Sequence, residues 1–481
     1  MDRCLRFGLL LALLVGTAVL LRPVPTSAAG ADESDFVQGV VSGLAVTFDL
    51  PTSLAYGPDG RLYVAEQEGR IRAFTLDPST KAITAVQQVT SNADLQEVFG
   101  IAFDPTDGSS PPPVYATNTV SGFGVDGPAP NGTFPGKVTK IHGAGYGTIT
   151  DVITGLSISN SAHQANGLAF APDGTPYIAH GSTTNAGINT PAGPLFEQEE
   201  VPLSGAVLVA DPSAPLFDGN VTYSPAGVYS STVDQVSGDV SVYAAGLRNP
   251  YDIVVHSNGN IYVTDNGPNA GLGGGSTSCS TEDPDPWAPD DRGPDELNLI
   301  VAGDYYGHPN RNRGRFDARQ CVYHNGNEGS GADWTGPIEL LPVSSDGLVE
   351  YTSASFGGKL QGDLFYAGLI DGIIGHIELS PDGQSVVSHE TFASGLVFPL
   401  DLTVGPDGTL YVAQYATGEI KFYKPAQGPV GGVSLGGDLA SLPGQAAGGE
   451  DWLLGAAAAG AFLAATTLAG LAYARRRSLG R

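Results

Sequence analysis

The sequence predicts an all-β protein, a six-bladed β-propeller, and three observations support this fold class. Among its 481 residues are 67 glycines and 35 prolines but one methionine, a composition with many turns and few long helices. A unit of apolar strand, tight turn and second strand occurs six times. The copies are unevenly spaced, which suits a propeller because its connecting loops accept long insertions, whereas solenoid repeats keep a fixed period. A β-sandwich is the alternative fold.

The N-terminus has the pattern of a secretory signal peptide. Arg3 and Arg6 precede an apolar run from Phe7 to Leu21, and the small residues Ser27-Ala28-Ala29 follow. We therefore expect a signal peptide over 1–29, with cleavage near Ala29. The alternative is an uncleaved anchor.

The propeller is expected over 37–424, with the repeats as its landmarks. The four clearest copies read GPDGRLYVAEQ, APDGTPYIAHG, SNGNIYVTDNG and GPDGTLYVAQY, and looser copies lie at 100–118 and 360–368. Asn258-Gly259 separates two strand-like runs, Tyr251–Val255 and Asn260–Asp265. Asn-Gly between such runs is a strong signal for a β-hairpin.

The C-terminus carries a predicted membrane anchor. Residues 425–450 form a linker rich in Gly, Pro and Ala, and the uncharged stretch 452–474 is long enough to span a bilayer as a transmembrane helix. The basic tail, 475–481, would stay in the cytoplasm, which places the propeller on the cell surface or the periplasmic face. The same pattern is found in sorting tails that are cleaved after export, so this alternative stays open.

Charge and cysteine content narrow the partners and the compartment. Residues 30–451 hold 49 acidic and 15 basic side chains, a net charge of −34, which argues against a nucleic-acid partner. Cys279 and Cys321 remain once the signal peptide is removed. An even pair in an exported domain favours one disulfide, with two free thiols as the alternative.

The stretch from Gly246 to Pro309 contains the most specific motifs. It reads GLRNPYD, then TDNGPN, then PDELNLIVAGDYYGHP, so a cation and an amide (Arg248-Asn249) stand close to several oxygen donors. Such groups can hold a polyanion and a hard metal ion. From about Leu44 to Tyr423 the chain resembles the glucose/sorbosone dehydrogenase family. This resemblance implies a six-bladed propeller that uses pyrroloquinoline quinone (PQQ) and calcium to oxidise a small sugar or polyol.

The resemblance assigns catalytic residues. His163, in SAHQANGLAFAPDG, matches the general base that takes the sugar hydroxyl proton, a role that suits imidazole. The family has an aspartate nineteen residues later, where this chain has Ser182. A serine can orient an imidazole through a hydrogen bond, but it cannot stabilise the imidazolium by charge.

The resemblance also assigns binding residues. Arg248 and Asn249 match cofactor ligands, and Gln96 lies one residue out of step with a third. Gly267 and Pro268 match the backbone carbonyls that bind calcium, and the acidic pair 295–296 matches residues that brace their loop. The alternative for each motif is structural, a strand cap or a turn.

Three cations of the family pattern are missing. Ile370 stands where the family has a lysine, and Phe398 and Leu400 stand where it has two arginines. PQQ is a tricarboxylate and needs several cations. Lys359 or the arginines of 311–315 are the candidates for compensation, and without them we expect weak PQQ binding.

The favoured function is that of an exported, membrane-tethered, PQQ-dependent aldose dehydrogenase, whose electron acceptor stays open. The first alternative is a non-catalytic propeller with structural calcium that binds a glycan or a protein partner at the cell surface. The second alternative is a metal-dependent lactonase, for which the required Glu, Asn and Asp set is not evident in the sequence.

Overall fold

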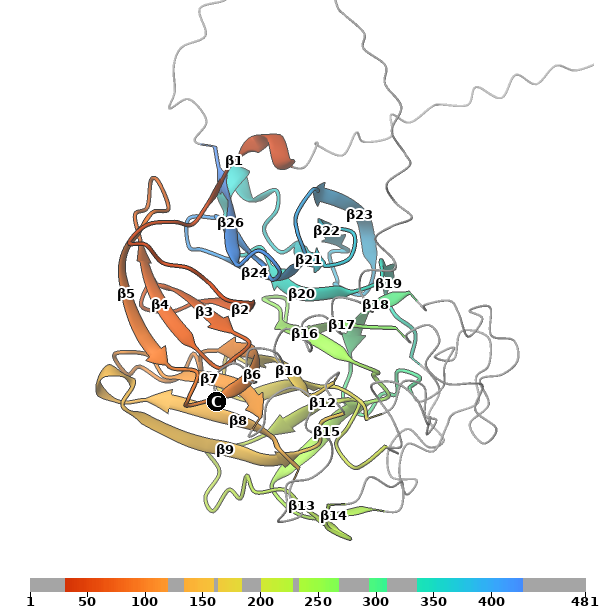
Figure 1. Cartoon of the computed structure of the whole chain (residues 1–481). Coiled ribbons are helices and arrows are strands. Elements are labelled where there is room, and N and C mark those ends of the chain that lie inside the picture. Colours follow the sequence, from red (N-terminus) through yellow and green to blue (C-terminus); the bar gives the residue numbers. More distant parts are fainter. Residues whose placement is uncertain are drawn as a thin grey trace, which may run out of the picture.

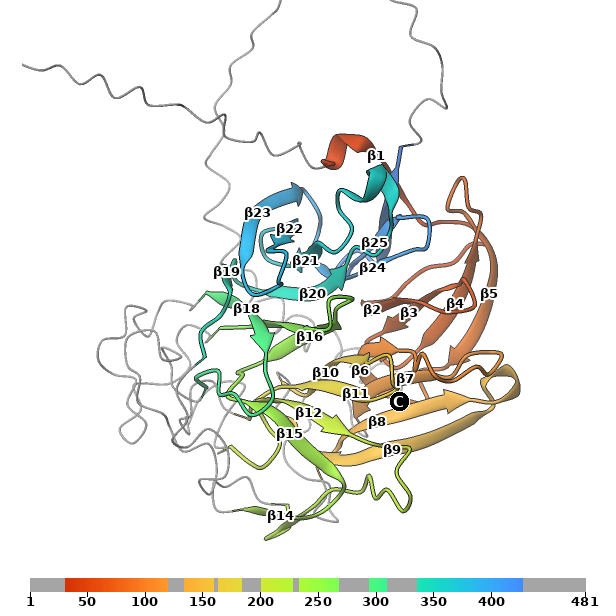
Figure 2. The ribbon, with the colours of Figure 1, turned by 180° about the vertical axis from the view of Figure 1, so that it is seen from behind.

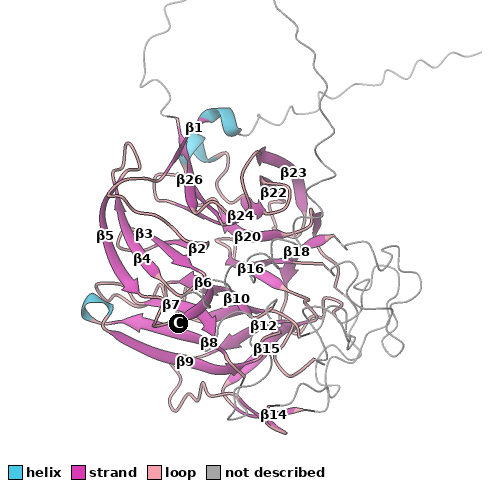
Figure 3. Cartoon of the chain, in the orientation of Figure 1, coloured by secondary structure: helices cyan, strands magenta, loops and turns pink. Residues whose placement is uncertain are grey.

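The computed structural model describes residues 31–119, 134–159, 163–183, 200–227, 233–267, 294–308 and 335–426. Strands dominate this part of the chain, with three short 3-10 helices at Glu33–Asp35, Ala144–Tyr146 and Ser355–Gly358 (Figure 3). None of its helices is long and apolar enough to cross a membrane. Several sequence predictions lie outside the described residues: the signal peptide, the linker, the transmembrane segment, the basic tail, Pro268, the cysteine pair and the arginines of 311–315.

The described strands form six antiparallel four-stranded sheets, the blades of a propeller (Figure 1). The first two blades are β2 (Pro51–Tyr56), β3 (Leu62–Glu66), β4 (Ile71–Leu76) and β5 (Ile83–Thr90), then β6 (Gln96–Ala102), β7 (Val114–Thr119), β8 (Gly136–His142) and β9 (Thr148–Leu156). The third is β10 (Ala165–Phe170), β11 (Pro176–His180), β12 (Ala206–Ala210) and β15 (Val240–Ala245), with a hairpin of β13 (Thr222–Ser224) and β14 (Asp234–Ser237) inserted.

The other three blades follow the same plan. The fourth is β16 (Pro250–Val255), β17 (Ile261–Asp265), β18 (Asp295–Ile300) and β19 (Glu339–Leu341). The fifth is β20 (Ser345–Glu350), β21 (Leu364–Gly368), β22 (Ile373–Leu379) and β23 (Val386–Ala393). The sixth is β24 (Pro399–Val404), β25 (Leu410–Gln414), β26 (Glu419–Pro425) and the N-terminal strand β1 (Phe36–Val40).

The blades close into a ring. The innermost strands β2, β6, β10, β16, β20 and β24 each contact the next one, and β24 contacts β2. The sixth blade joins both ends of the described chain, because β1 pairs with β26 from Phe36 opposite Pro425 to Val40 opposite Lys421, and the two strands lie side by side in both views (Figures 1 and 2). The all-β, six-bladed prediction is therefore confirmed.

Each sequence repeat is the first hairpin of a blade. Asn258-Gly259 lies in the turn between β16 and β17, where the sequence predicts it. The glycines at this turn position in the four clearest copies have positive φ values, between 76° and 90°. This is a conformation that glycine adopts without steric cost, so the turn sequence determines the hairpin.

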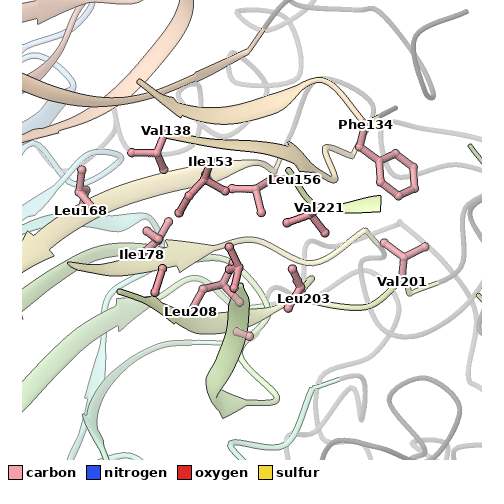
Figure 4. Close-up of a cluster of buried hydrophobic side chains, with 14 of the residues drawn as sticks. Phe134, Val138, Ile153, Leu156, Leu168, Ile178, Val201, Leu203, Leu208 and Val221 are labelled. Atoms are coloured by element: carbon pink, nitrogen blue, oxygen red, sulfur yellow. The ribbon is translucent and has the colours of Figure 1, made fainter. Parts of the chain in front are cut away.

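The apolar core lies between neighbouring blades. In the largest cluster, Val138 and Ile153 of the second blade face Leu168, Ile178 and Leu208 of the third (Figure 4). All five side chains are buried. Stacked sheets pack in this way because each blade buries one face against the preceding blade and the other face against the following blade.

Buried aspartates add polar links between inner strands. Asp252 Oδ2 accepts a hydrogen bond of 2.8 Å from the Leu348 amide in the next blade, and Asp401 Oδ2 accepts one of 2.6 Å from the Leu54 amide. Burial raises the pKa of Asp401 to about 7 and also raises the pKa of Asp252. These carboxyl groups tie blades together and favour the protonated form.

The propeller has two distinct ends. We call the end with the six turns between first and second strands the turn face, and the opposite end, where the innermost strands begin, the site face. Lys359 lies between β20 and β21 and hence on the turn face. The expectation that it compensates for a missing cation at the cofactor site is therefore wrong.

Candidate active site

The site face brings together most of the residues singled out in the sequence. His163 precedes β10, Ser182 follows β11, Arg248 and Asn249 precede β16, and Gly267 follows β17. The Ser182 amide donates to the Arg248 carbonyl at 2.7 Å, which links the third and fourth blades. The site is therefore built from loops at the ends of neighbouring blades, as is common for propellers.

His163 is buried and its ring orientation is fixed. Nδ1 lies 2.9 Å from the backbone oxygen of Ser182 and 3.3 Å from the hydroxyl of the same residue. A carbonyl oxygen only accepts, so Nδ1 carries the proton and Nε2 is the basic nitrogen. Within the described part of the chain Nε2 has no hydrogen-bond partner. Burial, and then the charge of Arg248, hold the pKa of His163 well below its ordinary value, so the ring is neutral at neutral pH.

Gly181 is required by this arrangement. A Cβ atom at this position would lie 2.7 Å from His163 Cβ and 2.7 Å from Asn249 Oδ1. Contacts this short cannot be relieved without moving His163 or the Asn249 side chain. Glycine thus allows His163 and Asn249 to approach one another.

Asp265 fixes the backbone of the cationic segment. The Asn249 amide donates to its Oδ1 at 2.7 Å, and the Arg248 amide lies 3.1 Å from both of its oxygens. The Arg248 guanidinium is buried and donates to the Asn266 carbonyl at 3.3 Å. Burial lowers the pKa of Arg248 to about 10, against the opposing effect of Asp295, so the side chain is still charged at neutral pH.

A row of amides continues across the site. Asn166 Nδ2 donates to Asn249 Oδ1, and Asn249 Nδ2 donates to Asn266 Oδ1, each at 2.9 Å. Asn266 Nδ2 then donates to Asp295 Oδ2 at 2.9 Å. Sequence reasoning assigned no role to the Asn166 or Asn266 side chain, although both residues stand inside the quoted motifs SAHQANGLAFAPDG and TDNGPN.

Asp295 makes the bracing contacts that the sequence predicts. Its carboxylate accepts the Gly267 amide at 2.8 Å and the Ser345 amide at 2.7 Å, in addition to the Asn266 side chain. The backbone around Gly267 is therefore held in place. The described residues contain no cluster of three or more His, Cys, Asp or Glu side chains suited to a metal. The resemblance implies that a calcium ion here would bind backbone carbonyls near Gly267.

Among the described residues, no side-chain hydrogen bond joins Gln96 to the other site residues. Gln96 begins β6 with its side chain exposed. The next residue, Glu97, is buried, and its carbonyl accepts a hydrogen bond of 2.7 Å from the side chain of Gln164, beside His163. Gln67 donates to the Glu97 carboxylate at 2.8 Å. The assignment of Gln96 to the cofactor stays a prediction.

The three apolar replacements lie on or near the site face. Ile370 is in the turn between β21 and β22 and is 36% exposed, whereas Leu400 is on β24 and only 5% exposed. Phe398 directly precedes β24 with a positive φ of 49°. The described residues therefore fit an anionic ligand at the Arg248 end of the site. At positions 370, 398 and 400, however, a tricarboxylate would meet apolar side chains and no cation.

Two buried residues behind His163 were not assigned from the sequence. Glu200 and His308 lie 2.7 Å apart, from Oε1 to Nε2. His308 belongs to the GDYYGHP motif, and this membership is the signal that could have identified it. Glu200 ends a Glu-rich insertion, and its role depends on contacts that no local pattern reveals.

The fold and the site together define a class of protein: a six-bladed β-propeller with a buried histidine and a buried arginine where its innermost strands begin. The family described as Glucose / Sorbosone dehydrogenase matches residues 48–421, and the chain belongs to that family.

Named relatives are consistent with this assignment. The chain is 25% identical over 304 residues to Quinoprotein glucose dehydrogenase B of Acinetobacter calcoaceticus, an alignment that covers 60% of the chain. The chain spans only about half (55%) of the length of that relative.

Two solved structures share the fold. The PQQ-bound form of aldose sugar dehydrogenase from Streptomyces coelicolor has a TM-score of 0.52 at 18% identity, with 82% of this chain and 99% of that chain covered. The apo-form of the soluble aldose sugar dehydrogenase from Escherichia coli has a TM-score of 0.53 at 16% identity, with 81% and 100% covered. At these identities the likeness establishes the fold.

Proposed function

We propose that this protein is a sugar dehydrogenase of the aldose type that uses a PQQ-like quinone and calcium. The observation that carries the proposal is the geometry of His163, a buried neutral imidazole with Nδ1 bonded to a carbonyl and Nε2 available as a base. This arrangement suits proton abstraction from an alcohol. Family membership and the names of the relatives support the same reaction.

In this proposal the residues of the chain handle the proton and the charge. His163 Nε2 accepts the proton of the sugar hydroxyl, while the carbon of that hydroxyl loses a hydride, so an aldose becomes its lactone. A quinone, when bound, supplies the hydride acceptor. Arg248 provides positive charge beside it, and Asn249 is held by Asn166 and Asn266 on the same side. Burial of these groups strengthens their electrostatic effects on the reaction.

The proposal is tested with the full chain supplied with calcium and PQQ. Dye reduction is measured over a panel of aldoses for the wild type, for His163→Ala and for His142→Ala, a control histidine on an outer strand, β8. We expect sugar-dependent reduction by the wild type and the control, and none by His163→Ala. Activity that survives His163→Ala would refute the assignment of the base.

The second candidate is a non-catalytic propeller that binds a glycan or a partner protein, and the apolar side chains at positions 370, 398 and 400 favour it. It predicts no dye reduction at any PQQ concentration, together with retained binding to immobilised glycans that does not depend on PQQ. The same experiment therefore separates the two candidates.

We also propose that the propeller is exported and anchored by residues 452–474. This rests on the terminal sequence patterns, the apolar N-terminal run and the uncharged C-terminal stretch followed by arginines. Protease added to intact cells should release the propeller and leave the arginine tail protected. Protection of the propeller with cleavage of the tail would reverse the orientation.

A further inference from the structure

A single peptide group connects the base to a buried carboxylate. His163 Nδ1 donates to the oxygen of Ser182 at 2.9 Å, and the N–H of that same peptide group, at Thr183, donates to Glu200 Oε2 at 3.0 Å. The hydrogen bonds therefore run in one direction, from imidazole through peptide to carboxylate. Position 182 lacks the carboxylate of the family pattern, yet a carboxylate lies one peptide further along the chain of bonds.

Glu200 is held firmly in this position. Its Oε2 also accepts the hydroxyl of Ser204 at 2.7 Å and that of Thr183 at 3.1 Å, while Oε1 contacts His308 Nε2 at 2.7 Å. Its side chain is 3% exposed. A buried carboxylate is costly unless donors surround it, and here donors come from three segments of the chain.

The arrangement has a definite electrostatic effect on His163. Hydrogen bonds in a chain polarise one another, so the carboxylate makes the Ser182 carbonyl a stronger acceptor. The bond lengths place Nδ1 within about 8 Å of the carboxylate, where a buried negative charge still stabilises a positive one. The imidazolium that forms when His163 takes a proton would therefore be stabilised by Glu200.

We infer that Glu200 is a positioning residue that acts on His163 through the Ser182–Thr183 peptide, in place of a carboxylate in direct contact with the imidazole. The inference rests on the proposed function, because it gives Glu200 a part in the same proton transfer. Glu200 fixes the Nδ1–H tautomer and supports the charged ring.

The charged groups around His163 give the sign of the effect. Arg248 and His308 lower the pKa of His163, whereas Glu200 raises it. On the adjacent strand, both ring nitrogens of His180 lie near carbonyls, Leu203 at 2.7 Å and Ser157 at 2.9 Å. Loss of the Glu200 charge would thus leave His163 among groups that disfavour its protonation.

Glu200→Gln in the full chain tests the inference, because glutamine keeps the size and one acceptor but removes the charge. The readout is the Nδ1–H proton resonance of His163 at neutral pH, in protein with ¹⁵N-labelled histidine. We expect an upfield shift and faster exchange with solvent, on the order of tenfold, the difference between a charge-assisted and a neutral hydrogen bond.

Glu350→Gln is the matched control. Glu350 is a buried glutamate on the turn face that accepts the amide of Ser257 at 2.8 Å and also its hydroxyl. This variant should leave the His163 resonance unchanged. An equal change in both variants, or none in Glu200→Gln, would overturn the inference.

The wild type alone provides a second test, in case Glu200→Gln does not fold. A His163 ring that carries its proton on Nε2 at neutral pH would overturn the inference without any variant.

The two proposals can fail separately. A His163 resonance that responds to Glu200→Gln in a protein that oxidises no sugar would leave the peptide-mediated coupling in place and remove the dehydrogenase. Sugar oxidation by a protein whose His163 resonance does not respond to Glu200→Gln would support the dehydrogenase and remove the peptide-mediated coupling. If both hold, the acid limb of the kcat/KM pH profile should move to lower pH in Glu200→Gln.

Discussion

Restoring positive charge at the site face should strengthen PQQ binding. The useful variant is Ile370→Lys combined with Phe398→Arg, because both positions are at loop ends of the site face, where a long side chain can reach solvent or ligand. Leu400 is excluded from the design since it is 5% exposed on an inner strand, and a buried arginine there would cost stability. Phe398 already has a positive φ, so arginine at that position adds no new backbone strain.

The size of the effect follows from the number of charged hydrogen bonds gained. Each hydrogen bond to a charged group contributes roughly 1.5–3 kcal/mol. Two such bonds to carboxylates give roughly 3–6 kcal/mol, a gain of about two to four powers of ten in affinity at about 1.4 kcal/mol per factor of ten. Side-chain ordering and solvent exposure at position 370 will place the measured gain near the lower end.

Calorimetric titration of the full chain with PQQ in the presence of calcium measures this gain. The matched control is Leu216→Lys with Val387→Arg, which adds the same charge at exposed apolar positions away from the site face. We expect weak binding by the wild type and the control, and tighter binding by the site variant. An equal gain in PQQ affinity in both variants would show that net charge, and not the position of the new cations, causes the effect. Tight binding by the wild type would refute the reasoning from the missing cations altogether.

Three further outcomes follow from the described contacts. Asp265→Ala leaves the buried amides of Arg248 and Asn249 without their acceptor, so denaturant unfolding should show a loss of roughly 2–5 kcal/mol; a loss below about 1 kcal/mol would contradict this role. The raised pKa values of Asp252 and Asp401 mean that the folded state retains protons that the unfolded chain releases near pH 4. Their contribution to stability is therefore lost as pH rises from about 4 to about 7. The melting temperature should be higher at pH 5 than at pH 8. After Asp→Asn changes at both positions, the melting temperature should depend less on pH. Chelation of calcium should lower the melting temperature, and added calcium should restore it. A melting temperature that does not change with chelator at low calcium would contradict the calcium site.

The blade architecture could be predicted because its signals are local. Asn258-Gly259 defines its hairpin through the left-handed conformation that glycine allows, and the same chemistry recurs in the other repeats. The outer strands of the blades could be predicted less well from local sequence signals. Strand β19, Glu339–Leu341, pairs with β18 across the long insertion that separates them, so its place in the fourth blade depends on tertiary contacts. The hairpin of β13 and β14 has no counterpart in the repeats.

The site could be predicted only where one segment carries the chemistry. His163, Arg248 and Asn249 stand in recognisable motifs, and the structure gathers them. The orientation of the imidazole by the Ser182 carbonyl could not be foreseen, because the side chain at that position says nothing about a backbone acceptor. The wrong expectation for Lys359 has the same origin, since sequence distance does not reveal which face of a propeller a loop occupies.

The buried carboxylate of Glu200 also bears on the choice between enzyme and binding module. Replacement of a buried ionic group by apolar residues is often neutral or stabilising, so stability alone is a weak reason to keep such a group. A glycan-binding propeller would need no charge behind His163. A dehydrogenase would need a negative charge there, because its base becomes cationic in each turnover inside a site that already holds Arg248. The three apolar positions argue for weakened cofactor binding, whereas the peptide-linked Glu200 favours the proposal that His163 accepts a proton during the reaction.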